Sequence, residues 1–379
     1  MQAEGWSKSK VMRELRRARK EDATFADGSI MGSMCTAPHE VAGAAHALYS
    51  EVNLGDPAHF PGSARLEREA LADMLQLFNA PRGAEARFTS GGTEANILAC
   101  WIAREKTKRR QVIVPASAHF SFEKAARLLE MQLVTVPTDA AGHADPAAMA
   151  KAVGPDTALM LVIAGTTELG LVDPVEEIAK WCARNEVLLH VDAAYGGYLL
   201  PFMEEAGRKP ARFDLGLAGV WSLAVDPHKG AMATIPAGVL MLRDGRDWAR
   251  TAVKSPYVST DTQSTLSGTR PGSAAAATWA VHRHLGRAGL AGLAETCLDN
   301  AAYLAARLPE LGCELVASPE LAVVTFRAAD PAGLAAELAT RGFRLNVIPR
   351  FSALRIVVQP HVTRKTIDAF LVELEACLP

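Results

Sequence analysis

Between residues 85 and 245, short apolar runs alternate with stretches of helical periodicity, and this alternation restricts the fold more than any other feature. The runs consist of β-branched and other apolar residues without polar alternation, which is typical of strands buried on both faces. Helices interleaved with such strands predict a mostly parallel α/β sheet. The expected strands are QVIVPA, QLVTVP, TALMLVIAG, VLLHVDAA, VWSLAVD and GVLMLR, and the expected helices include FSFEKAARLLEM and PVEEIAKWCARN.

After the loop STLSGTRPGS the pattern changes, and a long alanine-rich helical stretch extends toward residue 308. The remainder predicts a smaller α+β domain, with strands CELVAS, LAVVTFR and LRIVVQP and helices PAGLAAELATRG and RKTIDAFLVELEACL. We therefore expect three parts: an N-terminal arm (residues 1–50), a large sheet domain (51–285) and a small C-terminal α+β domain (286–379).

Composition and charge narrow the class of protein. Of 379 residues, 49% are hydrophobic and 22% are charged, which is typical of a soluble globular chain. A net charge of −2 gives no reason to expect nucleic acid or an anionic membrane as a partner. The basic run Arg16 to Lys20 is flanked by acidic residues, which favours a solvated helix face over a targeting peptide. The six cysteines are scattered without zinc-ligand spacing, so we expect a reduced, cytoplasmic setting and no metal site.

The stretch WSLAVDPHKG carries Lys229 to the end of a buried strand. A lysine at a strand end is usually a solvated amine. Among apolar residues, however, its charged form is disfavoured, and we expect a nucleophilic neutral amine to be accessible. Such an amine can form a Schiff base with an aldehyde, and pyridoxal 5'-phosphate (PLP) is the common aldehyde cofactor.

A PLP site also needs a carboxylate beside the pyridine nitrogen, and Asp192 in LLHVDAAYGG ends a neighbouring strand. Small residues follow it, so a flat ring could lie close. Alone, this aspartate could equally cap the next turn. Beside Lys229, the interpretation as a partner of the ring is favoured.

The stretch SGGTEAN precedes an apolar helix and could bind a phosphate. Gly91 and Gly92 would let backbone N–H groups approach an anion at the positive end of the helix. Ser90 or Thr93 could also cap this helix, and both interpretations can hold together. His119, in ASAHFSFEKAA, ends another strand and could stack on a pyridine ring.

Taken in order, SGGTEAN, AHFSFEKA, GTTELGLVD, HVDAAYGG and DPHKG resemble the group II PLP-dependent amino-acid decarboxylases. The stretches GSMCTAPHEVA, NLGDPAHFPGSARLEREAL and ALRIVVQPHVTR are similar to the short archaeal-type L-tyrosine/L-aspartate decarboxylases. The resemblance extends from about Gly28 to the final helix. It implies fold type I, the aspartate-aminotransferase-like fold, with a large, mostly parallel seven-stranded sheet domain and a small α+β domain.

The resemblance implies PLP as the cofactor and assigns roles to particular residues. Lys229 would form the Schiff base, Asp192 would pair with the pyridine nitrogen, and His119 would stack on the ring. The supporting residues would be Gly92, Thr93 and His228 at the phosphate, and Thr167 and Asp173 near the cofactor and Asp192.

The resemblance also implies a mobile loop, and Tyr257 in VKSPYVSTDTQ is the residue expected to protonate the substrate carbon after CO2 leaves. An exposed loop aromatic is the alternative. Arg355 would meet a substrate carboxylate, although a salt-bridge arginine is almost as good an interpretation. His59 and Phe60 could line an aromatic pocket. Asp226 stands where many eukaryotic members have Asn, which favours the short branch.

The expected function is therefore PLP-dependent decarboxylation of an L-amino acid. L-Tyrosine is favoured on the precedent of the family, and L-aspartate and L-glutamate remain open. The alternatives are an aminotransferase or carbon–carbon lyase of the same fold, and a non-catalytic PLP-binding protein. The resemblance further implies a homodimer in which the lid and SGTRPGS act across the interface.

Overall fold

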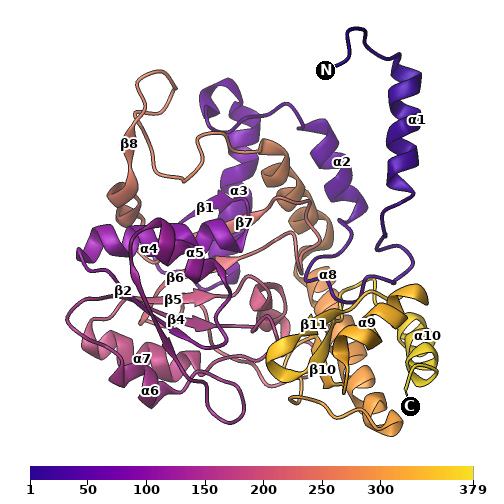
Figure 1. The fold of residues 1–379 in the computed structure, drawn as a ribbon. Coiled ribbons are helices and arrows are strands. Elements are labelled where there is room, and N and C mark those ends of the chain that lie inside the picture. Colours follow the sequence, from indigo (N-terminus) through magenta and orange to yellow (C-terminus); the bar gives the residue numbers. More distant parts are fainter. Residues whose placement is uncertain (379) are drawn as a thin grey trace.

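A seven-stranded sheet forms the centre of the computed structural model, which describes residues 1–378 (Figure 1). The strand order is β1-β7-β6-β5-β4-β2-β3, and β7 alone runs antiparallel to its neighbours. The expected mostly parallel sheet is thus confirmed. The strands are β1 (Glu85–Thr89), β2 (Gln111–Pro115), β3 (Gln132–Val136), β4 (Thr157–Ile163), β5 (Leu189–Asp192), β6 (Val220–Val225) and β7 (Gly238–Leu242).

Helices cover both faces of this sheet because successive strand residues point to opposite sides. In β4, Leu159 and Leu161 pack with α4 and α5, whereas Met160 and Val162 belong to the core on the other face. Figure 1 shows α4 and α5 together in front of the sheet. The helices of the large sheet are α3 (Pro61–Leu77), α4 (Gly92–Thr107), α5 (Ser121–Leu128), α6 (Pro146–Lys151), α7 (Val175–Asn185) and the first part of α8 (Gly272–Arg307).

The C-terminal part holds a second sheet in the order β10-β12-β11, with antiparallel pairing. The expected strand CELVAS is wrong: Leu315 makes only an isolated bridge to Phe326. Gly312 and Pro319 flank this segment, and both residue types interrupt a strand. The segment therefore pairs with β10 only briefly. The elements here are β10 (Val323–Arg327), α9 (Pro331–Thr340), β11 (Asn346–Ile348), β12 (Ala353–Val357) and α10 (Arg364–Glu375).

The expected boundary between the large and small domains falls at a kink of α8, where Gly286 has φ 58°. The division itself stays a prediction, and its last residue, 379, lies outside the described residues. Short connecting elements complete the chain: the hairpin of β8 (Val253–Lys254) and β9 (Thr262–Gln263), and 3₁₀ turns at Pro57–His59, Gly196–Tyr198, Leu200–Phe202, Gly245–Thr251, Leu308–Leu311 and Pro349–Phe351.

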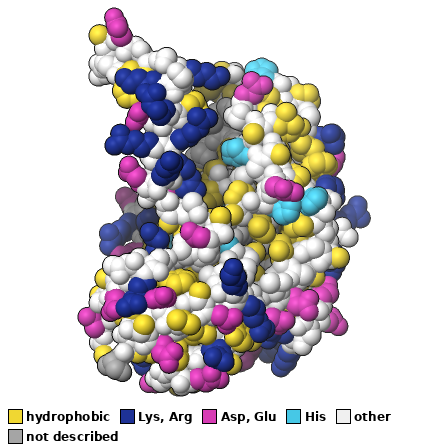
Figure 2. All heavy atoms as spheres, turned by 90° about the vertical axis from the view of Figure 1, so that its right-hand side faces the viewer, with side chains coloured by type: hydrophobic (Ala, Val, Ile, Leu, Met, Phe, Trp, Pro, Cys, Tyr) yellow, Lys and Arg dark blue, Asp and Glu magenta, His cyan; other side chains and the backbone are white. Residues whose placement is uncertain are grey.

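The N-terminal arm has two helices in different surroundings. Helix α1 (Lys8–Arg19) stands away from the body and buries none of its residues (Figure 1). Figure 2 shows Lys and Arg side chains along this projecting helix. Helix α2 (Glu40–Leu48) packs against α8. Among the helices of residues 1–378, none combines the length and apolarity needed to cross a membrane.

Candidate active site

The carboxyl ends of β4, β5 and β6 border a cavity of about 460 Å³. Ligands of open α/β sheets bind at this edge. The cavity brings together most of the residues expected at a cofactor site, namely Gly92, Thr93, His119, Thr167, Asp192, His228 and Lys229.

Lys229 lies just beyond β6, and its Nζ is 3.1 Å from Oδ2 of Asp226. Burial lowers the pKa of this lysine, but the carboxylates of Asp226 and Asp192 outweigh burial and hold the pKa above its usual value. The expectation that burial alone would favour the neutral amine is therefore wrong for this structure. The amine is an ammonium held by an anion, and it must lose a proton before it can attack an aldehyde.

Asp192 is the last residue of β5, and its carboxylate is fixed from two sides. Its Oδ2 accepts a hydrogen bond of 2.8 Å from Nδ2 of Asn96, and its Oδ1 accepts one of 3.0 Å from the backbone N–H of Ala194. The side chain is buried at the cavity wall. Asp192 can therefore present an ordered anion to a cationic ring nitrogen.

Helix α4 begins beside Lys229 without a side-chain cap. The expected cap by Ser90 or Thr93 is wrong, because Gly91 is the N-cap residue and no side chain bonds to the first turn. Gly91 has φ 153°, and a Cβ there would lie 3.3 Å from Cε1 of His228. The first-turn N–H groups and this imidazole thus border one small space, which suits an anion.

Two histidines flank the cavity, and burial lowers the pKa of both. His119 follows β2, and its Nδ1 is 3.0 Å from the hydroxyl of Ser121. The Nδ1 of His228 is 2.5 Å from the carbonyl oxygen of Ala237. Each ring therefore has one nitrogen engaged by the protein and lies in a fixed orientation.

Thr167 lines the cavity, whereas Asp173 does not. The carboxylate of Asp173 accepts hydrogen bonds from the backbone N–H groups of Ala144 (2.8 Å) and Ile163 (2.7 Å). Burial raises its pKa to about 6. Asp173 therefore ties a loop to the end of β4, one layer away from the cavity.

Arg355 of β12 is buried and does not line the cavity. Its Nη1 donates to the carbonyl oxygen of Thr167 and its Nη2 to that of Gly32, both at 2.7 Å. The guanidinium thus joins the small sheet and the N-terminal arm to the cavity wall at Thr167.

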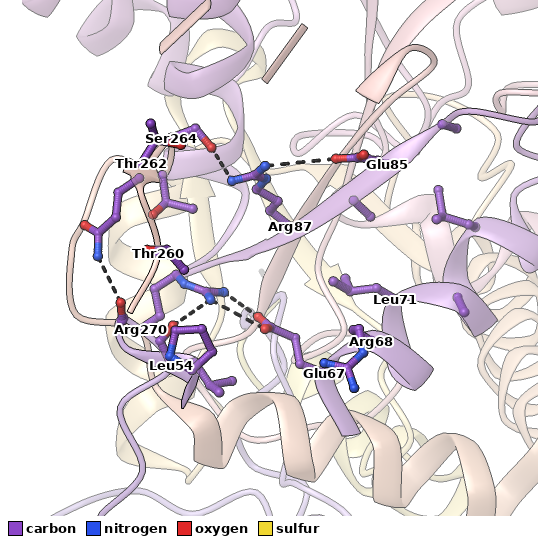
Figure 3. Close-up of a pocket in the computed structure, with 18 residues that line it drawn as sticks. Leu54, Glu67, Arg68, Leu71, Glu85, Arg87, Thr260, Thr262, Ser264 and Arg270 are labelled. Atoms are coloured by element: carbon purple, nitrogen blue, oxygen red, sulfur yellow. Dashed lines mark hydrogen bonds and ion pairs between the residues drawn. The ribbon is translucent and has the colours of Figure 1, made fainter. Parts of the chain in front are cut away.

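Tyr257, His59 and Phe60 also lie away from the cavity that contains Lys229. Tyr257 is 88% exposed, in the segment between β8 and β9. The base of this hairpin borders a second cavity of about 480 Å³ between α3 and β1 (Figure 3). There Arg87 donates to Ser264, and Arg270 pairs with Glu67. Within one chain, the base of the hairpin thus borders a different cavity from the one that contains Lys229.

The cavity also includes residues that had no individual role among the expectations above. Asn96 was part of the SGGTEAN motif, and its position four residues after Gly92 puts it on the same helix face, a signal that could have identified it. The others include Ile163 of the strand TALMLVIAG, and Cys35, Phe120 and Tyr195, which lie in the stretches GSMCTAPHEVA, AHFSFEKA and HVDAAYGG that carry the family resemblance.

The residues around the cavity fit PLP. They provide an amine, a carboxylate, an imidazole that could stack on a ring and an uncapped helix terminus that could bind a phosphate. In addition, Oδ1 of Asp226 is buried and has no hydrogen-bond partner within residues 1–378. An orphaned buried oxygen is costly, and a group bound in the cavity could relieve that cost.

Comparisons with known proteins agree with this chemistry. Residues 42–329 match the pyridoxal-dependent decarboxylase conserved domain. The chain is 39% identical to the probable L-tyrosine/L-aspartate decarboxylase of Methanocella arvoryzae, over 99% of both chains. It is 42% identical to the protein of the same name from Methanopyrus kandleri, over 93% of this chain and 97% of that one.

Solved structures give the same fold, which is fold type I as expected. The sphingosine-1-phosphate lyase of Burkholderia pseudomallei aligns with a TM-score of 0.91 at 27% identity, covering 100% of this chain and 92% of that one. A glutamate decarboxylase of Lactobacillus brevis aligns with a TM-score of 0.90 at 20% identity, covering 100% and 93%. The chain belongs to the pyridoxal-dependent decarboxylase family and is a PLP-dependent amino-acid decarboxylase.

Proposed function

We propose that the protein decarboxylates L-tyrosine to tyramine, with L-aspartate (to β-alanine) and L-glutamate as the next candidates. The observation that carries the proposal is the convergence of Lys229, Asp192, His119 and the start of α4 on one cavity. Relatives that align over nearly the whole chain are named probable L-tyrosine/L-aspartate decarboxylase, which supports both of these substrates. Tyrosine is placed first on the precedent of the family.

When bound, PLP supplies an electron-poor ring that accepts the electrons released as CO2 leaves. In the proposal, Lys229 provides the amine that links the cofactor. Asp192 would pair with the ring nitrogen and keep its proton there, and the bonds from Asn96 and Ala194 orient its carboxylate for this role. His119 would stack on the ring. The backbone of Gly92 and Thr93 and the ring of His228 hold the phosphate.

Asp173 and Arg355 act indirectly in this proposal. Asp173 fixes the end of β4 through the N–H of Ile163, and Arg355 fixes the cavity wall through the carbonyl of Thr167. Both Nη atoms of Arg355 are engaged by backbone carbonyls, so in this proposal Arg355 shapes the cavity wall at Thr167 rather than meeting the substrate.

The proposal further includes a cytoplasmic homodimer. Tyr257 is exposed and remote from the cavity of its own chain, so we propose that it reaches the cavity of a second copy and protonates the substrate carbon there. His59, Phe60 and the segment SGTRPGS lie on the same side as this hairpin and would contribute across the interface.

Lys229→Ala tests the cofactor link. We expect the purified wild-type protein to show visible-range absorbance from Lys229-bound PLP and the variant to show none. Lys180→Ala, at an exposed ion pair on α7, is the matched control and should keep the absorbance. An unchanged spectrum in Lys229→Ala would contradict the assignment.

CO2 release from each of the standard amino acids tests the substrate. The highest kcat/KM should be obtained with L-tyrosine. A preference for L-aspartate or L-glutamate would replace tyrosine within the same reaction.

A carbon–carbon lyase is a second candidate, because the aligned lyase of Burkholderia pseudomallei is 27% identical over the whole chain. A lyase would release an aldehyde and no CO2, whereas an aminotransferase would consume a 2-oxo acid. A non-catalytic PLP-binding protein would show the absorbance without product.

A further inference from the structure

A buried set of hydrogen bonds lies behind the cavity and meets at Asn96, in the second turn of α4. The side chain is almost fully buried, with the residue 1% exposed. Its Nδ2 donates to Oδ2 of Asp192 at 2.8 Å and to Oγ of Ser121 at 2.9 Å. Its Oδ1 lies 2.9 Å from Nε2 of His190. One amide therefore uses both of its hydrogens and its oxygen.

The sheet explains why these groups meet. His190 and Asp192 are two residues apart in β5, so both side chains project to the face covered by α4. Reversing the amide would place its oxygen against the carboxylate of Asp192, which is repulsive. The orientation of Asn96 is therefore determined by its partners.

The protons of His190 follow from this orientation. The Oδ1 of Asn96 can only accept, so Nε2 of His190 carries a hydrogen. Burial lowers the pKa of His190 to about 4, so the ring is neutral and its Nδ1 accepts from the hydroxyl of Ser222 at 2.7 Å. The ring is thus a fixed donor to Asn96.

Ser121 links Asn96 to His119 in the same way. The Oγ of Ser121 accepts from Asn96, so its own hydrogen is available for Nδ1 of His119 at 3.0 Å. The backbone N–H of Ser121 also points at this Nδ1. The Nδ1 of His119 is therefore an acceptor, and its neutral ring carries the hydrogen on Nε2.

We propose that Asn96 is a positioning residue that holds the carboxylate of Asp192 and, through Ser121, fixes the tautomer of His119. The inference rests on the proposed roles of Asp192 and His119 at the cofactor. It goes beyond them because a single amide, which does not itself react, determines the orientation of Asp192 and the tautomer of His119.

The test compares Asn96→Ala with Asn300→Ala in the full-length, PLP-loaded protein. Asn300 is also a buried asparagine, but it lies on α8 and bonds to the carbonyl of Val362, in the C-terminal part. Two quantities are measured: the dissociation constant of PLP, and the ¹⁵N chemical shifts of the His119 ring, assigned with His119→Gln.

In the wild type, His119 should show the Nε2–H tautomer. Asn96→Ala should weaken PLP binding about tenfold or more, the effect of losing a hydrogen bond to a buried charge, and should mix the two tautomers. Asn300→Ala should change neither quantity. If Asn96→Ala leaves both as in the wild type, or if both variants weaken PLP equally, the inference is overturned.

Ser121→Ala tests the link from Asn96 to His119 separately from the link to Asp192. It also replaces Asn96→Ala if that variant does not fold. Ser121→Ala should weaken the preference of His119 for the Nε2–H tautomer, because only the longer bond of 3.3 Å from the backbone N–H of Ser121 remains. PLP affinity should change less than in Asn96→Ala, since the bond to Asp192 remains. A pure Nε2–H tautomer in Ser121→Ala would contradict the link through Ser121. Failure of the proposed function is distinguishable, because it would appear as missing absorbance in the wild type.

Discussion

Burial keeps the side chain of His190 uncharged. Its pKa is lowered to about 4, below the ordinary value of 6.5, because burial disfavours the imidazolium. Between these values the unfolded chain binds a proton that the folded chain does not. The free energy of unfolding should therefore rise with pH over this range, by about 3 kcal/mol from this one group.

The substitution His190→Gln removes this titration. The variant is expected to be less stable at pH 7, because it cannot bond to both Asn96 and Ser222, but it should lose less stability than the wild type between pH 6.5 and 4.5. Urea unfolding at several pH values measures the difference. An unchanged slope in His190→Gln would contradict the assignment of this titration to His190.

Lys229 shows the opposite balance, in which a neighbouring anion outweighs burial. Because Oδ2 of Asp226 is 3.1 Å from Nζ, the substitution Asp226→Asn should lower the pKa of Lys229. Each unit of decrease raises the neutral fraction of the amine about tenfold. After PLP is added, visible absorbance should therefore develop faster near pH 7, and the pH profile of this rate should move to lower pH. Asp299→Asn, at a surface ion pair, is the control, and a profile that does not move would contradict the role of Asp226.

The start of α4 is where an element, rather than one side chain, makes the binding surface. Gly91 has φ 153°, a conformation that L side chains rarely adopt, and His228 lies close to it. Gly91→Ala should distort the turn, at a cost of about 1–3 kcal/mol, and weaken PLP binding. Titration of PLP by tryptophan fluorescence measures the loss.

Gly83 provides the matched control, because it has φ 90° but nothing within 4 Å of an added Cβ. Gly83→Ala should lower the melting temperature without changing PLP affinity. If the two variants bind PLP equally well, the turn at Gly91 does not shape the cofactor site.

Most elements could be predicted from the sequence because their patterns are local. The apolar runs from 111 to 243 became strands, since a strand buried on both faces is apolar along its length. Strands β1 and β11 were missed: β1 mixes charged and apolar residues, and β11 has three residues. CELVAS has the composition of a strand, but it pairs with β10 only through the isolated bridge of Leu315 to Phe326. No local sequence pattern shows that this pairing stops after one bridge.

At the scale of the whole molecule, the motifs located the cavity because parallel strands end at one edge of the sheet. The chain order of SGGTEAN, HVDAAYGG and DPHKG sufficed to bring Gly92, Asp192 and Lys229 together. The bonds of Asn96 depend on distances between segments far apart in the chain, so they could not be predicted. The charge of Lys229 depends on the balance between its burial and the carboxylates of Asp226, three residues away, and Asp192, and that balance appears only in the folded structure. The exposure of Tyr257 likewise appears only in three dimensions.

That exposure leads to a prediction about two copies of the chain. If Tyr257 serves the cavity of a partner, Lys229→Ala and Tyr257→Phe should each be nearly inactive alone, yet they should complement one another when subunits are exchanged. In a mixed dimer, one cavity would have an intact Lys229 facing an intact Tyr257, and the other would have neither. Random exchange makes half of the dimers mixed, so about a quarter of the wild-type activity should return.

CO2 release before and after subunit exchange measures this recovery, and sedimentation should give a species of twice 40.4 kDa. Mixing Lys229→Ala with Asp192→Ala is the control. Both residues line the same cavity of one chain, so every chain in this mixture has a damaged cavity. In mixed dimers of this pair, neither cavity is complete, so no activity should return. No recovery in the test pair would place Tyr257 in the cavity of its own chain or outside the reaction. Recovery in the control would show instead that Lys229 and Asp192 do not act together in one cavity.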